Sequence, residues 1–170
     1  AVLIGGSASP IPVFSGNVLS DNSYNGIVWS GDIAADQTWG LIQGGTYAYV
    51  VRDARVDAGA TLTIDPDVVV KFDTYDDLMV YGDLVAVGTP SSPIVFTSIK
   101  DDACGGDTNS DGDASSPSSG DWGSVYFVDG SGVLEDCLLR YGGQYGSSSY
   151  REVIYDGGDG SLAVRDCDIR

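Results

Sequence analysis

Residues 107–113, with the sequence DTNSDGD, have the spacing of a cation-binding loop. Asp107, Asn109 and Asp111 occupy alternate positions, and Gly112 follows the third of them. Side chains at alternate loop positions can converge on one ion, and glycine permits the sharp turn after the third ligand. Ligands that are all oxygen favour a hard cation, and Ca²⁺ fits better than Mg²⁺, which retains its water. The segment therefore predicts a calcium site.

The second half of this segment departs from the EF-hand pattern that its first half follows. Ser118 stands at position twelve in place of the usual bidentate glutamate, and no flanking helices are expected. Other ligands must come from acids nearby, and Asp113 would offer its carbonyl or its carboxylate. The predicted calcium ligands are Asp101, Asp102, Asp107, Asn109, Asp111, Asp113 and Asp121. The alternative is a solvated acidic loop without a metal.

Mutual repulsion of carboxylates gives the same segment an energetic reason to bind Ca²⁺. Six aspartates lie within residues 101–121. Without a cation they repel one another, and a long loop without regular structure is unusual in a compact domain. We expect calcium removal to lower the melting temperature and to expose this loop to proteases. Residues 73–77 and 155–160 are weaker acidic clusters, which either hold a second ion or only form turns.

Two cysteines occupy equivalent positions in a short repeat. SGVLEDCLLR at 131–140 matches SLAVRDCDIR at 161–170, so Cys137 aligns with Cys167. If the two segments stack in register, the cysteines come within disulfide range. They are a disulfide candidate, and a reduced pair inside the core is the alternative. Cys104 would then be unpaired or bonded to another chain.

The residue types disfavour catalysis. The chain has no histidine, which removes imidazole bases, Ser-His and Cys-His pairs, and histidine-bound zinc or iron. Glu135 and Glu152 are the only glutamates for a glycosidase-type acid pair. Basic candidates for a lyase are few: Lys71, Lys100, Arg140 and Arg170. The last two align in the repeat, which suggests repeated structure. The sequence thus predicts that the protein is not an enzyme.

The net charge of −17 restricts the partners. Nucleic-acid binding needs Lys and Arg for phosphate contacts, and docking on an anionic membrane needs the same charges. The first apolar run, AVLIGG, is too short for a membrane span. Almost all the acid is Asp, which suits turns and metal loops. A generally acidic surface for solubility is the simpler explanation.

The candidate site residues lie between short apolar runs that are separated by Gly, Asp and Pro and that are expected to form strands. From Val50 onward the runs alternate with a period of two and show no helical period. Leu62 and Leu84 are 22 residues apart, as are Ile64 and Ala86, whereas Val70 and Ile94 are 24 apart. Three short strands in about 22 residues predict an all-β parallel β-helix, a solenoid whose stacked coils bury their apolar residues. A jelly-roll sandwich is the alternative.

The chain is expected to form one domain with an arm. Residues 1–25 are rich in Ser, Gly, Pro and Asn and predict an extended N-terminal arm or cap. Residues 26–170 form the β-helix domain, with a loop insertion at 100–121. Trp29, Trp39, Tyr47 and Tyr49 either plug the open end of the solenoid or are ordinary core residues.

Three motifs carry a resemblance to a known group. They are AGATLTIDP at 58–66, GxLxAxGT followed by PIxFTS at 82–98, and DDxxGGDTNxDG at 101–112. Over residues 27–170 the chain resembles the right-handed parallel β-helix repeat proteins of bacterial and archaeal cell surfaces, which are pectate-lyase-like in fold. The resemblance implies a right-handed solenoid in a secreted or cell-surface protein with an adhesive or structural role. It implies no activity.

Together these observations predict a non-catalytic, calcium-stabilised extracellular structural protein. The strand that ends at Arg170 has no evident cap, so we expect self-association into a filament, head to tail, through the solenoid ends and the N-terminal arm. One alternative is an adhesive, glycan-binding module, and the other is a degenerate polysaccharide lyase or hydrolase. Tyrosines that could stack on sugars are Tyr141, Tyr145, Tyr150 and Tyr155.

Overall fold

The computed structural model describes residues 2–5, 12–143 and 152–170, and these residues form strands and connections without a helix. The strands are β1 (Val2–Gly5), β2 (Ile27–Ile33), β3 (Gln37–Trp39), β4 (Tyr49–Val56), β5 (Thr61–Ile64), β6 (Val69–Phe72), β7 (Leu78–Val80), β8 (Asp83–Val87), β9 (Ile94–Ser98), β10 (Val125–Phe127), β11 (Ser131–Glu135), β12 (Cys137–Leu139), β13 (Ile154–Asp156), β14 (Leu162–Arg165) and β15 (Asp168–Ile169). Every strand ladder among them is parallel. No helix in the described part of the chain is long and apolar enough to cross a membrane.

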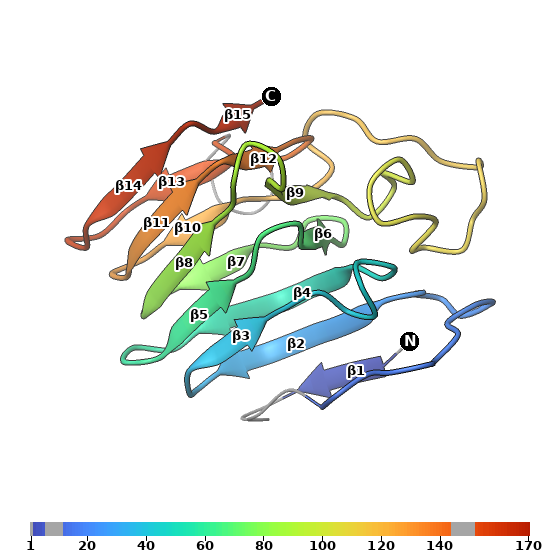
Figure 1. Cartoon of the computed structure of the whole chain (residues 1–170). Helices are drawn as coiled ribbons and strands as arrows, with labels where there is room; N and C mark the ends of the chain where they lie inside the picture. Colours follow the sequence, from blue (N-terminus) through green and yellow to red (C-terminus); the bar gives the residue numbers. More distant parts are fainter. Residues whose placement is uncertain (1, 6–11, 144–151) are drawn as a thin grey trace.

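The strands lie in two sheets that face each other across the core (Figure 1). The smaller sheet has the order β14-β11-β8-β5-β3. The larger has ten strands, and it curls into a half-barrel. Strand β4 causes the curl, because its first half pairs with β6 and its second half with β7. Asp53, between the halves, has a φ of 50°, which turns the strand at this point.

The predicted parallel β-helix, a regular solenoid with coils of about 22 residues, is wrong. Leu62 does pair with Leu84, but Asp83 pairs with Ser131, 131 − 83 = 48 residues later. The register also differs in the larger sheet, where Val70 pairs with Phe96 and not with Ile94. Strand β4 continues from the group that pairs with β6 into the group that pairs with β7, so two faces of the expected coil become one curled sheet. The long connection between β9 and β10 interrupts the repeat. The result is two parallel sheets rather than a column of equal coils.

Apolar side chains from both sheets fill the space between them. Burial alternates along β5 and β8, as the period of two predicts for strands with one face inward. The large aromatics are core residues: Trp29 and Trp39 are fully buried, and the Trp39 ring stacks on Tyr49 at 4.7 Å. In the same core, Phe72 stacks on Trp122 at 3.9 Å between ring centres. Trp122 thereby anchors the long connection between β9 and β10 to the sheet.

The N-terminal segment is attached to the domain by strand pairing and by hydrogen bonds. Strand β1 pairs with β2, with Val2 opposite Ile27. Just before β2, the Asn25 N–H donates a 2.7 Å hydrogen bond to the carbonyl of Thr108. Thr108 belongs to the connection between β9 and β10, which extends away from the sheets (Figure 1).

Candidate metal centre

The connection between β9 and β10 is tied to the sheet at both ends by aspartates. At its start, Thr97 Oγ1 donates to Asp101 Oδ2 at 2.6 Å, and both residues are buried. At its end, Asp121 accepts hydrogen bonds from Ser98 Oγ and Lys100 Nζ, each at 2.8 Å. Burial raises the pKa of Asp121, but the hydrogen bonds from Lys100, the Ser118 N–H and Ser98 outweigh it and hold the pKa below its ordinary value. These two carboxylates fix the ends of the loop.

Between these anchors, three carboxylates converge. Oxygen atoms of Asp102, Asp107 and Asp111 all lie within 4.8 Å of one another. Each belongs to the predicted ligand set, and they form the one such group in the described part of the chain. Asp101, Asp113 and Asp121 lie outside it. Burial first, and then the charge of Asp107, raises the pKa of Asp102, with smaller contributions from Asp111 and Asp113.

Three buried oxygen atoms in this loop have no hydrogen-bond partner: Asp102 Oδ1, Asn109 Oδ1 and Asp111 Oδ1. The companion atoms of Asn109 and Asp111 are used within the loop, since Asn109 Nδ2 donates to Asp111 Oδ2 at 2.9 Å and Ser115 Oγ donates to the same oxygen. Buried polar atoms nearly always have a partner. Three acceptors without a donor on neighbouring side chains match the ligand set of a hard cation.

Local backbone geometry shapes the loop around Asp107. Asp107 Oδ1 accepts from the Asp111 N–H at 3.1 Å, and its Oδ2 accepts from the Gly112 N–H at 3.0 Å. Gly112 has a φ of 61°, in the left-handed region that favours glycine, as the motif predicts for the residue after the third ligand. Ser110 has a φ of 57°, and its hydroxyl accepts a 2.6 Å hydrogen bond from Asn25 Nδ2. The residues before β2 therefore help to hold the loop.

Lys71 is a buried cation beside the three carboxylates that the sequence did not indicate. It lies in β6 with no exposed surface, and its Nζ donates to the Gly106 carbonyl at 2.5 Å. Burial lowers its pKa to about 8 against the opposing charges of Asp102, Asp101, Cys104 and Asp107. No periodicity argument predicts a lysine facing into this connection. The only signal was a lone Lys in an otherwise apolar run, VVVKF.

The other predicted acidic clusters behave differently. At residues 73–77, Asp76 shares a hydrogen bond with Asp53, and burial together with the charges of Asp53 and Asp73 raises its pKa to about 7. Asp73 accepts a hydrogen bond from the Tyr24 hydroxyl and lies 3.5 Å from Arg52 Nε. Neither this cluster nor residues 155–160 bring three ligand atoms together among the described residues.

The disulfide candidate consists of two neighbouring thiols. Leu138 pairs with Asp168 and Leu139 with Ile169, so the 30-residue offset holds and Cys137 lies beside Cys167. Burial, followed by the charge and hydrogen bond of Cys167, raises the pKa of Cys137. All three cysteines are free thiols in this structure. Formation of the disulfide stays a prediction.

Of the four tyrosines predicted to stack on sugars, the structure describes Tyr141 and Tyr155. Tyr141 packs against the core, and Tyr155 makes an edge contact with Tyr126 at 4.9 Å. Tyr145 and Tyr150 lie outside the described residues.

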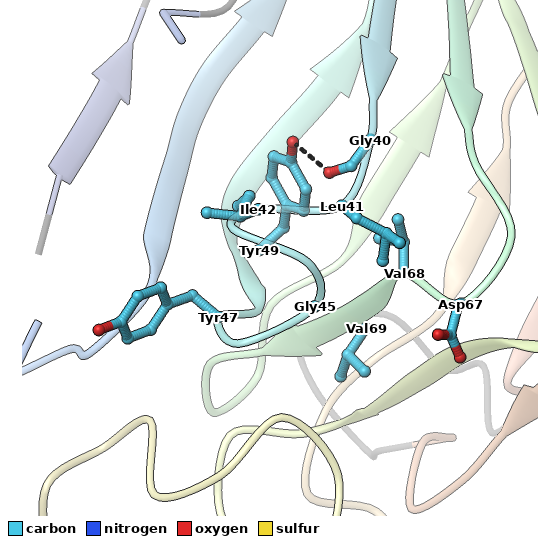
Figure 2. A pocket seen from close by; sticks show the side chains of 9 residues that line it. All are labelled: Gly40, Leu41, Ile42, Gly45, Tyr47, Tyr49, Asp67, Val68 and Val69. Carbon is cyan, nitrogen blue, oxygen red and sulfur yellow. Dashed lines mark hydrogen bonds between the residues drawn. The ribbon is translucent and has the colours of Figure 1, made fainter. Parts of the chain in front are cut away.

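The hollow in Figure 2 lies under the turn after β3, and its lining includes Tyr47 and Tyr49. There the Tyr49 hydroxyl donates to the Gly40 carbonyl at 3.0 Å. The hollow has no volume for a water-sized molecule, so it is packed structure.

Comparison with known proteins found no matching family model, no similar curated protein and no similar solved structure.

Proposed function

We propose that this chain is a non-catalytic structural module of an extracellular protein, stabilised by calcium bound between β9 and β10. The observation that carries the proposal is the convergence of Asp102, Asp107 and Asp111 together with the unpartnered buried oxygens of this loop. The three carboxylates beside the ammonium of Lys71 leave a net charge of −2, which one divalent cation neutralises. Asn109 Oδ1 supplies a neutral ligand. The remaining calcium ligands would be water and loop carbonyls.

The location follows from the expected affinity. Three carboxylates in a partly exposed loop, without a bidentate glutamate, suit the Kd of about 10⁻⁴–10⁻³ M found in extracellular modules. Calcium at such concentrations is available outside cells. A structural role is supported by the site's position, because the loop contacts Asn25 at one end of the fold and is fixed near Trp122 at the core.

A pair of matched variants tests the calcium site. Asp111→Asn and Asp113→Asn each remove one negative charge from the same loop, but only Asp111 belongs to the converging group. We expect calorimetric calcium titration to give binding in the wild type and in Asp113→Asn, and binding about tenfold weaker or more in Asp111→Asn. Equal affinity in the two variants, or no calcium binding by the wild type, would contradict the proposal.

Self-association, head to tail, is a second candidate, favoured by the ends of the sheets. Among the described residues, strand β1 pairs with β2 alone at one end, and β13, β14 and β15 each have one partner at the other (Figure 1). All strands are parallel, so a second copy can add in the same direction at either end. Apolar residues are exposed there: Leu3 is 67%, Val164 41% and Ile169 48% exposed. Unpaired strand edges of this kind favour addition of another strand.

Sedimentation velocity and electron microscopy, each with calcium and after chelation, test this candidate. Val164→Lys, on the end strand β14, should abolish assembly because a charge blocks the edge. Val87→Lys is the control, since Val87 is similarly exposed at 38% but lies on β8 between two partners. A wild-type protein that remains monomeric at high concentration with calcium would exclude head-to-tail assembly.

A further inference from the structure

Lys71 lies beneath the loop that carries the proposed calcium ligands. Its side chain has no exposed surface. Val70 and Phe72, its neighbours in β6, belong to the core, so the alternation along the strand directs Lys71 to the outer face of the larger sheet. The connection between β9 and β10 covers this face, since a Cβ on Gly105 would lie 3.5 Å from Lys71 Cε. The loop therefore buries a cation that the core does not touch.

The ammonium group of Lys71 is held beside the proposed ligands. Its Nζ donates to the Gly106 carbonyl at 2.5 Å, and Gly106 directly precedes Asp107. Burial lowers the pKa of Lys71 to about 8, and the charge of Asp102 opposes this shift more than any other charge does, so the group is still a cation at neutral pH. Asp102 and Asp107 are two of the three carboxylates that converge. One positive charge is therefore built into the surroundings of the metal site.

A fixed ammonium group has two opposite effects on a site of this kind. Without a bound ion, its charge offsets the repulsion among the carboxylates, which helps the loop to keep them together. When a cation binds, the same charge repels it, and the repulsion grows with the charge of the ion. Lys71 cannot easily move away, because its stem is packed under Gly105 and its Nζ is bonded to the Gly106 carbonyl. The repulsion therefore persists in the ion-bound state.

We propose that Lys71 is a built-in counter-ion that keeps the calcium affinity of this loop low and lowers its affinity for trivalent ions even more. The inference rests on the calcium site proposed above and adds a control of its affinity. A weak site suits an extracellular module, which meets calcium at high concentration. Purely structural support of the loop by Lys71 predicts the opposite result, because its removal would loosen the loop and weaken binding. The direction of the change in affinity thus separates the two roles.

Neutral replacements of Lys71 test the proposal in calorimetric titrations with Ca²⁺ and Tb³⁺ at neutral pH. Lys71→Met keeps the length of the buried stem, and Lys71→Gln keeps a donor for the Gly106 carbonyl. We expect both variants to bind Ca²⁺ about tenfold and Tb³⁺ about thirtyfold more tightly than the wild type, because the repulsion that is lost scales with the charge of the ion. Arg55→Met is the control with wild-type affinities, since Arg55 pairs with Asp32 and Asp57 in another part of the molecule.

Different outcomes overturn this proposal and the calcium site itself. A wild-type protein that binds no Ca²⁺ contradicts both. Calcium binding by the wild type, with equal or weaker affinity in both Lys71 variants, overturns the counter-ion role alone. An equal gain for Ca²⁺ and Tb³⁺, or the same gain in Arg55→Met, also overturns that role. If neither Lys71 variant folds, nuclear magnetic resonance of the wild type decides: the Lys71 Nζ signal should shift as calcium saturates the site, and a signal that does not move overturns the proposal.

Discussion

Aspartates at the corners of the strands take a backbone conformation that most residues avoid. Asp136 joins β11 to β12 with a φ of 49°, and Asp166 joins β14 to β15 with a φ of 50°. The left-handed region costs an ordinary L-residue roughly 1–2 kcal/mol, less for Asp, and nothing for Gly. The aspartate that recurs in the two repeat segments therefore has a conformational role, which the aligned sequences alone did not reveal.

Substitution at Asp136 tests this conformational role. We expect Asp136→Ala to lower the free energy of unfolding by about 1 kcal/mol, and Asp136→Gly to preserve or slightly increase it. Urea unfolding measures both. At Asp129, which is exposed and not left-handed, the order should reverse, because there glycine only adds freedom to the unfolded chain. An alanine at 136 as stable as glycine would refute the conformational explanation.

Asp76 gives the protein a stability that depends on pH. Its pKa rises from 3.8 to about 7 in the fold, through burial first and then the charge of Asp53. The folded state therefore keeps a proton that the unfolded state releases near pH 4, so the free energy of unfolding should fall as pH rises from about 4 to about 7 and then level off. Thermal melts in chelator across this range should show less decline in Asp76→Asn, which cannot ionise. A profile unchanged in Asp76→Asn, or changed equally in the exposed Asp83→Asn, would contradict this assignment.

At the scale of elements, Trp122 fixes the connection between β9 and β10 to the larger sheet, and Gly142 leaves room for the indole of Trp122. A Cβ on Gly142 would lie 2.8 Å from Trp122 Cζ2. The indole cannot easily move, because it stacks on Phe72 and donates to the Arg140 carbonyl. We expect Gly142→Ala to destabilise the protein by about 1–3 kcal/mol and to shift tryptophan fluorescence. Gly40→Ala, whose Cβ would meet only the end of the Asp65 side chain, should cost less.

The sequence predicted strands and some of their pairing, but not how the sheets close. The period of two marked β5 and β8, and the spacing of Leu62 and Leu84 gave their register. The curl was not predictable, because β4 is one continuous run, YVVRDARV, in which Asp53 bends the strand by backbone conformation rather than by an evident breaker. The register of β6 on β9 was wrong by two residues, because equal apolar residues on alternate positions allow such a slip.

The candidate site was predictable where local spacing decides it. The motif predicts Asp107 and Asp111 as ligands. Asp101 and Asp121 are also carboxylates, but they already accept hydrogen bonds from Thr97, Ser98 and Lys100. Those partners come from the end of β9 and are known only once the loop is folded. Long-range contacts likewise bring Lys71 and Asn25 to the loop from 35 and 82 residues away.

At the scale of the whole molecule, a net charge of −17 opposes the compact folded state through mutual repulsion. Stabilisation by calcium therefore has two possible explanations, which an experiment must separate. If Ca²⁺ only screens a generally acidic surface, Mg²⁺ at the same concentration should stabilise equally, and added NaCl should reproduce the effect. If it binds the converging carboxylates, Ca²⁺ should raise the melting temperature more than Mg²⁺, and the difference should persist in NaCl. Mass action gives about 2.7 kcal/mol of added stability at a calcium concentration of 100 Kd.

The decisive comparison is a set of melts in Ca²⁺, Mg²⁺ and chelator, each at two NaCl concentrations, for the wild type, Asp111→Asn and Asp113→Asn. We expect the advantage of Ca²⁺ over Mg²⁺ to vanish in Asp111→Asn and to remain in Asp113→Asn, while NaCl alone stabilises all three proteins in chelator. Limited proteolysis should cut within residues 99–124 only when calcium is absent or Asp111 is changed, because a bound ion would hold the middle of the loop between the ends that Asp101 and Asp121 attach to the sheet. Equal stabilisation of every variant by both divalent ions would assign the whole effect to the acidic surface.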